Sequence, residues 1–262
     1  IMPSLVGSEM CIRDRSYRLY MSSISPTTTT VAMHMSDGII NAPTSALFGV
    51  VALAGLAICA WRARSDLDEK AVPMAGLVAA FIFAVQMINF PILPGVSGHL
   101  LGGALAAILV GPYTGALCIA IVLVVQALLF ADGGVTALGA NITNMALIST
   151  FAGYLVAVVL VRLIRTRPLP TGGLAAIAFV SALCGTVCAA TGFVVEYALG
   201  GAATTSLGTV AVYMWGTHVL IGVGEGLITA VTVVAVARAR PDLVYLLRFA
   251  SRRSTTPTGV PA

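Results

Sequence analysis

Seven apolar runs follow one another after Met33 and leave this chain few ways to fold. Most are about twenty residues long, the length that a helix needs to cross a hydrocarbon core of roughly 30 Å. Only 9% of the residues are charged and 58% are hydrophobic, so one buried core cannot hold all the apolar side chains. The sequence therefore predicts an all-α integral membrane protein with about seven transmembrane helices. The runs are approximately Ser45–Ala63, Val72–Phe90, Leu100–Val110, Thr114–Phe130, Asn144–Ile164, Leu174–Tyr197 and Val210–Ala237.

The third run, Leu100–Val110, is short for a full crossing. Pro94 and Gly95 precede it, and Gly111 and Pro112 follow it. Proline and glycine interrupt helices, and backbone that is not helical is tolerated at membrane depth only where protein surrounds it. We therefore expect this helix to be tilted or to begin with buried irregular backbone.

Every lysine and arginine after Met33 lies at the end of the first, the fifth or the seventh run or follows it, which places all eleven on one face of the membrane. Such residues collect on the cytoplasmic side. The sequence thus predicts that Met33 lies outside and that the C-terminus is cytoplasmic, with residues 241–262 as a cytoplasmic tail. The eleven are Arg62, Arg64, Lys70, Arg162, Arg165, Arg167, Arg238, Arg240, Arg248, Arg252 and Arg253.

Residues 1–32 differ from the rest of the chain. They hold three arginines, a Ser/Thr/Pro stretch and no apolar run long enough for a signal-peptide core. The string from Ser4 to Arg15 also resembles a translated sequencing-adaptor sequence. We interpret residues 1–32 as a non-native extension from gene calling, or else as a disordered extension. The natural start is then expected at Met33, with a seven-helix transmembrane domain over residues 33–240.

The predicted outer face collects the unusual polar residues and has no lysine or arginine beside them, so it should attract cations. Histidine is the commonest ligand of borderline divalent metals, and polar residues inside a membrane are costly enough to indicate function. The pattern favours a metal site, and the alternative is histidines that only make structural hydrogen bonds. The residues are His34, His99, His218, Asp37, Asp132 and Glu196.

His34 has a special position in a chain that starts at Met33. The free amine, the amide nitrogen of the second residue and its imidazole can form fused chelate rings around a metal. Planar coordination by nitrogen suits Ni(II) or Cu(II), and a second imidazole would complete four ligands. His99 is the best candidate, because flanking glycines allow irregular backbone to approach the site, whereas His218 is committed to a helix.

Further polar residues are expected to cover the ion or to orient its ligands by hydrogen bonds. Asn141 and Asn144 belong to a glycine-rich loop, for which an ordinary re-entrant or interfacial loop is the alternative. Glu225, two turns below His218, is expected to make a structural hydrogen bond to another helix. The full set of covering residues is Asp37, Ser97, Asn141, Asn144 and His218.

Two negative observations narrow the function. The five cysteines form no C-x-x-C pair, which argues against a disulfide framework and a thiolate metal site. No stretch reads G-x-x-x-x-G-K-[ST], so the chain has no P-loop for a nucleotide and any ATP-driven step needs partners. The basic residues mark topology rather than a nucleic-acid surface.

Five segments in order resemble the CbiM/NikM family, the cobalt- and nickel-binding membrane subunits of energy-coupling-factor (ECF) ABC transporters. The resemblance implies metal ligation by Met33, through its amine, by His34 and by His99. A retained extension before Met33 would abolish that amine, so the resemblance also implies a chain that begins there. The segments are Met33–Gly38 (MHMSDG), Gly95–Gly103 (GVSGHLLGG), Leu109–Pro112 (LVGP), Gly133–Asn141 (GGVTALGAN) and His218–Gly226 (HVLIGVGEG).

The resemblance further implies a transporter subunit and not an enzyme. It would take up Co(II), for cobalamin biosynthesis, or Ni(II), as substrate rather than cofactor, across the plasma membrane of a prokaryote. The implied partners are a transmembrane coupling subunit, two ATPase subunits and a small accessory membrane subunit. Two alternatives stay open: an intramembrane metalloenzyme using His34, His99, His218 and Glu225, which lacks an HExxH pair, and an ATP-independent metal channel or carrier.

Overall fold

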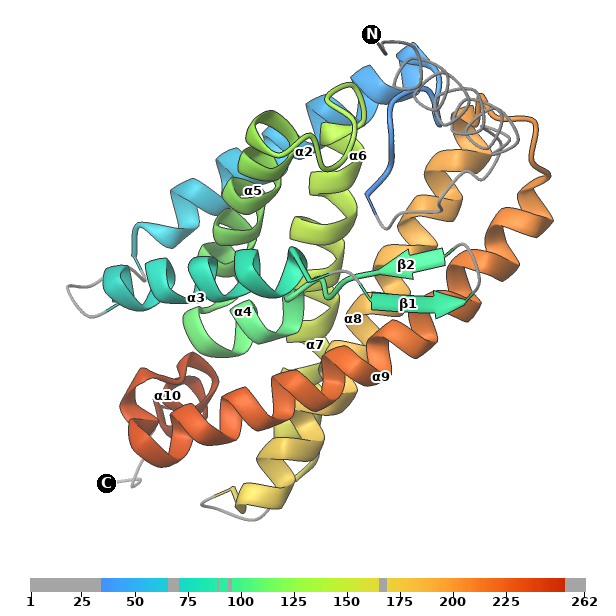
Figure 1. The fold of residues 1–262 in the computed structure, drawn as a ribbon. Helices are drawn as coiled ribbons and strands as arrows, with labels where there is room; N and C mark the ends of the chain where they lie inside the picture. Colours follow the sequence, from blue (N-terminus) through green and yellow to red (C-terminus); the bar gives the residue numbers. More distant parts are fainter. Residues whose placement is uncertain (1–33, 66–70, 89, 94–95, 165–168, 253–262) are drawn as a thin grey trace, which may run out of the picture.

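A computed structural model describes residues 34–65, 71–88, 90–93, 96–164 and 169–252 of the chain. Its described part is helical apart from a short hairpin, and Figure 1 shows the long helices packed into one bundle. The helices are α2 (Ala42–Ala63), α3 (Ala71–Gln86), α4 (Gly103–Val110), α5 (Pro112–Leu129), α6 (Leu138–Asn141), the π-helix η1 (Ile142–Ile148), α7 (Ser149–Leu163), α8 (Thr171–Gly200), α9 (Leu207–Ala239), the 3-10 turn η2 (Pro241–Leu243) and α10 (Tyr245–Arg252). The strands are β1 (Phe90–Leu93) and β2 (Val96–Gly98), which pair antiparallel.

Five helical stretches among the described residues are long and apolar enough to cross a membrane: α2, α5, the continuous stretch Leu138–Leu163, α8 and α9. Helix α3 is apolar but shorter, and α4 has only 8 residues. Each of the seven predicted runs overlaps one of these helices, so the expectation of an all-α membrane protein is confirmed. The number of crossings and the orientation of the chain stay predictions.

Large apolar side chains lie exposed on the outside of the bundle. Leu53 on α2 and Val231 on α9 are each 71% exposed, and Ile121 on α5 is 62% exposed. A soluble protein rarely presents so continuous an apolar surface, whereas lipid tails cover it without cost.

Helix α4 lies at the centre of the bundle, and all eight of its residues are buried. Small residues let its neighbours approach: a Cβ on Gly115 would lie 3.0 Å from the Ala106 carbonyl carbon, and one on Gly153 would lie 2.8 Å from the Ala104 Cβ. Leu100 and Leu101, just before this helix, are buried and not helical. The prediction of buried irregular backbone at the start of the third run is confirmed.

The chain after α9, predicted only as a tail, is folded as far as residue 252. Val244 and Leu246 are fully buried in the main core, and the Tyr245 ring lies 6.3 Å from the Tyr154 ring between centroids. Figure 1 shows α10 at the opposite end of the bundle from α6 and the start of α2. The apolar positions of this arginine-containing helix were not recognised in the sequence.

The segment before α2 is attached to the connection between α8 and α9. The Asn41 amide donates to the Gly200 carbonyl at 2.7 Å, and the Ala202 amide donates to the Ile39 carbonyl at 2.9 Å. The Asn41 side chain also caps α2 by accepting from the Thr44 amide at 3.0 Å. These bonds fix the course of the residues that carry His34.

Candidate metal-binding site

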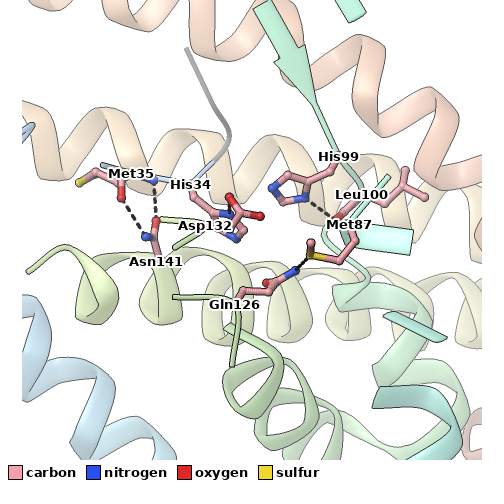
Figure 2. Close-up of polar contacts among 8 residues, drawn as sticks. All are labelled: His34, Met35, Met87, His99, Leu100, Gln126, Asp132 and Asn141. Atoms are coloured by element: carbon pink, nitrogen blue, oxygen red, sulfur yellow. Dashed lines mark hydrogen bonds and ion pairs between the residues drawn. The ribbon is translucent and has the colours of Figure 1, made fainter. Parts of the chain in front are cut away.

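Two histidines far apart in sequence meet inside the bundle. The rings of His34, in the segment before α2, and His99, directly after β2, lie 4.6 Å apart between centroids and are tilted by 38°. Both side chains are buried, with 3% of His34 and 2% of His99 exposed. Figure 2 shows the two imidazoles turned toward one another. The structure thus brings together the two histidines for which a shared metal site was predicted.

Hydrogen bonds indicate which nitrogen of each ring carries a proton. The His34 Nδ1 lies 2.9 Å from the Asp132 Oδ1, and the His99 Nδ1 lies 2.9 Å from the Leu100 carbonyl oxygen. An ionised carboxylate and a carbonyl only accept, so each Nδ1 donates. In the neutral rings Nε2 then holds the free lone pair, and both Nε2 atoms are buried with no hydrogen-bond partner among the described residues. A neutral imidazole nitrogen with a free lone pair is the form that binds metals.

Asp132 reaches His34 because the loop after α5 turns back on that helix. The Asp132 amide donates to the Gln126 carbonyl at 3.1 Å, and Ala131 takes a positive φ of 53°. Gly133 has a φ of +89°, and a Cβ there would lie 3.1 Å from the His34 Cβ, so glycine allows the close approach. The hydrogen bond from His34 is the main reason that the pKa of Asp132 falls below its ordinary value, against the opposing effect of burial.

Asn141, a predicted covering residue, acts on the backbone beside His34 rather than on an imidazole. Its Oδ1 accepts from the Met35 amide at 2.8 Å, and its Nδ2 donates to the Met35 carbonyl at 3.1 Å. The Gly134 amide donates to the same carbonyl at 3.0 Å. The side chain thus pairs with Met35 as a neighbouring strand would, and it fixes the residue that follows His34.

The segment that carries His99 is fixed by helices α3 and α9. The Glu225 carboxylate accepts from the amides of Leu101 at 2.9 Å and Gly102 at 3.0 Å, while Gln86 Nε2 donates to the Leu101 carbonyl at 2.8 Å. Thr186 of α8 adds a third donor to the carboxylate at 2.9 Å, which confirms the expected structural hydrogen bond of Glu225 to another helix.

One polar residue near the imidazoles, Gln126, was missed in the sequence. Gln126 of α5 is fully buried, its Nε2 lies 3.8 Å from the Met87 Sδ, and its Oε1 has no hydrogen-bond partner in the described structure. Figure 2 shows Gln126 and Met87 beside the two histidines. A glutamine inside an apolar run was the available signal, because a buried amide needs a polar neighbour.

The remaining predicted residues lie at varying positions relative to the histidine pair. Asp37 is exposed and accepts from the Thr136 hydroxyl at 2.5 Å, which lowers its pKa. Asn144 donates to Glu196 at 2.6 Å, within the bundle. The Nδ1 of His218, which is buried, lies 2.7 Å from the Met214 carbonyl oxygen. Ser97 belongs to strand β2, while its side chain and the whole of Met33 lie outside what the structure describes.

Burial holds His99 neutral, chiefly through desolvation of its charged form and then through the nearby His34, so that its pKa falls to about 3. We expect the His99 imidazole to stay neutral as the pH is lowered from 7.5 to 5, which nitrogen NMR of labelled histidine would show. Unfolded chains take up this proton near pH 6.5, so acidification below that value should reduce stability. A midpoint for His99 near 6.5 in the folded protein would contradict the burial described here.

In the described part of the chain, side chains alone do not complete a metal site. Among the residues that the structure describes, no three His, Cys, Asp or Glu side chains gather in a way that could hold a metal ion. Two imidazole nitrogens therefore need further donors, and backbone nitrogens at His34 and before it are the nearest candidates in sequence.

Comparison with known proteins gives a consistent result. Residues 34–243 match the family model CbiM, described as the cobalt uptake substrate-specific transmembrane region. The chain is 41% identical over 212 residues to a putative fused nickel transport protein NikMN of Archaeoglobus fulgidus, covering 81% of this chain and 68% of the relative. It is 32% identical to the cobalt transport protein CbiM of Sorangium cellulosum, covering 82% of this chain and 96% of that protein.

A solved structure has the same fold. The crystal structure of a truncated transition metal transporter aligns with a TM-score of 0.68 and 29% identity, over 79% of this chain and 99% of that one. The family match extends over most of the chain, including both histidines of the pair and the helices that hold them. By this match, the chain belongs to the CbiM family of cobalt uptake substrate-specific transmembrane proteins.

Proposed function

We propose that this chain is the substrate-binding membrane subunit of an ATP-driven ECF-type transporter that takes up Co(II) or Ni(II). The observation that carries the proposal is the pair of buried imidazoles whose ring centroids lie 4.6 Å apart, with the Nε2 lone pair of His99 free of any hydrogen-bond partner among the described residues. Imidazole nitrogen suits nickel and other borderline divalent metals, whereas Mg(II) and Ca(II) prefer oxygen ligands. Relatives named for nickel transport and for cobalt transport support the same two ions.

Four nitrogens would bind the ion: the amine of Met33, the amide and imidazole of His34, and the imidazole of His99. The chelate ring that joins the His34 amide to its own imidazole closes through Nδ1, because Nε2 points away from the backbone. That Nδ1 donates to Asp132 in the structure. Metal binding would thus require the His34 ring to carry its proton on Nε2 instead of Nδ1 and the amide to release its proton to water. It would replace the hydrogen bond to Asp132 by a bond to the metal, while His99 contributes its free Nε2.

Energy for uptake would come from partners. The sequence contains no P-loop, so two ATPase subunits and a transmembrane coupling subunit would drive release, with a small accessory membrane subunit also expected. In this proposal the ion is captured at the outer face of the plasma membrane of a prokaryote. Motion of the partners then reorients the subunit and opens the site to the cytoplasm.

Calorimetric titration of purified protein that begins at Met33 tests the proposal. Ni(II) and Co(II) are expected to bind at one site per chain, and an excess of Mg(II) should not compete, because nitrogen donors select against it. Failure of both ions to bind, or equal binding of Mg(II), would refute the metal site. Uptake by this chain alone in vesicles without ATP would refute the ATP-driven part.

A further inference from the structure

Glu225 makes an unusual contact for a carboxylate inside a membrane-spanning helix. It is 1% exposed, and its oxygens accept from two successive backbone amides, Leu101 and Gly102, and from the Thr186 hydroxyl. A buried carboxylate is costly unless its oxygens are hydrogen-bonded. Three donors meet this requirement, two backbone amides of the segment before α4 and one hydroxyl of α8. The carboxylate therefore keeps all its hydrogen bonds only while that segment stays in this position.

The segment before α4 enters a buried helix that has no side-chain cap of its own. Gly102 is the residue before α4, has a φ of +81° and offers no side chain to accept from the first amides of the helix. The start of a helix also carries partial positive charge, which a carboxylate stabilises. Glu225 on α9 accepts from the N-cap amide of Gly102, as the carboxylate of a capping box does, and from the amide of Leu101 before it, so it holds the segment that enters the helix.

The same contact fixes the position of His99, which lies two residues before Leu101. Glu225 holds the amide of Leu101 and Gln86 holds its carbonyl, so both polar groups of this residue are attached to neighbouring helices. The His99 imidazole is in turn oriented by the Leu100 carbonyl within the segment.

His34 is fixed by different elements. Asp132, in the loop after α5, binds its ring, and Asn141 of α6 binds the next residue. The two imidazoles are thus held by separate groups of helices, and their separation depends on where α9 places the His99 segment. Building on the proposed function, we propose that Glu225 is a positioning residue of the metal site: its carboxylate sets the place of the His99 imidazole and links metal affinity to the position of α9.

Metal titration of three variants in the Met33-start protein tests this inference. Glu225→Ala is expected to weaken Ni(II) and Co(II) binding about 10- to 100-fold, the usual effect of losing a group that orients a metal ligand. Glu225→Gln keeps an oxygen acceptor for one of the two amides and should lie between the wild type and Glu225→Ala. Glu196→Gln is the matched control, since this carboxyl is equally buried but contacts Asn144 and not the His99 segment.

The visible spectrum of bound Ni(II) separates positioning from a general loss of stability. Displacement of His99 would change the ligand field, so the absorption bands of the Glu225 variants should shift while those of Glu196→Gln stay as in the wild type. Wild-type affinity and spectrum in Glu225→Ala would overturn the inference. Absence of metal binding in the wild type would instead overturn the proposed function.

Glu225→Ala can also prevent folding, because it leaves two buried amides without a hydrogen-bond acceptor. Thr186→Val then serves as the second test, since it removes one donor to the carboxylate and leaves both backbone bonds in place. It is expected to give a smaller loss of affinity with a measurable shift of the Ni(II) spectrum. An unchanged affinity and spectrum in both Thr186→Val and Glu225→Gln would also overturn the inference.

Discussion

Replacing His99 by asparagine is expected to weaken Ni(II) and Co(II) binding by at least about 100-fold, more than the loss of a group that only orients a ligand. The asparagine amide can take the place of the imidazole Nδ1 and keep the hydrogen bond to the Leu100 carbonyl, which is 2.9 Å long in the wild type. What disappears is Nε2, the nitrogen proposed to bind the metal. Calorimetric titration of the folded variant measures the loss directly.

His218→Asn provides the matched control for this variant. His218 is also buried, and its Nδ1 also lies against a carbonyl oxygen, that of Met214 at 2.7 Å. Its Nε2 is not among the buried nitrogens that lack a partner in the described structure. We expect this variant to bind both ions with less than about tenfold loss of affinity. Equal losses in the two variants would show that burial of histidine, rather than ligation by His99, explains the effect.

A single residue added before Met33 is expected to have the second large effect. Protein that begins at Ala32 carries a peptide nitrogen where the Met33-start protein carries an amine, and unlike a neutral amine a peptide nitrogen has to lose a proton before it can bind a metal. Loss of that donor and of its chelate ring should reduce affinity by at least about tenfold. Titrating both proteins with Ni(II) in parallel measures the difference.

Proteolytic removal of the added residue supplies the control. A protein with a cleavable extension ending directly before Met33 should bind weakly before cleavage and recover full affinity afterwards. Recovery shows that the amine matters and that folding of the extended protein is intact. Undiminished binding by the uncut protein would refute the amine chelate and leave the two imidazoles as the proposed ligands.

The helices of the fold could be predicted well because their signal is local. A run such as Leu174–Tyr197 is apolar over its whole length, and helix α8, Thr171–Gly200, contains it. The buried start of α4 was also foreseen, since glycine and proline on both sides of a short run leave little choice. Helix α10 was missed because its arginines suggested a solvated tail, while Val244 and Leu246 are buried against the bundle.

The histidine pair could be predicted in part. Flanking glycines indicated that His99 could approach His34, and the rings do lie together. The hydrogen-bond partners were harder to predict, because Asp132 is 98 residues from His34 and Glu225 is 124 residues from Leu101. Such pairs depend on how the loops and helices pack in three dimensions, which periodicity within one run does not encode. The partners of the two predicted asparagines, Met35 for Asn141 and Glu196 for Asn144, were likewise not evident from the sequence.

The π-helix Ile142–Ile148 between α6 and α7 has a consequence for the direction of Asn141. A π-helical turn holds one residue more than an α-helical turn, and one residue corresponds to about 100° of rotation around a helix axis. If α7 continued toward Asn141 as a regular α-helix, the Asn141 side chain would point in a different direction. The π-helix turns it toward Met35. A deletion within these seven residues would turn the amide away from its backbone partner, although it would remove no polar group from the site.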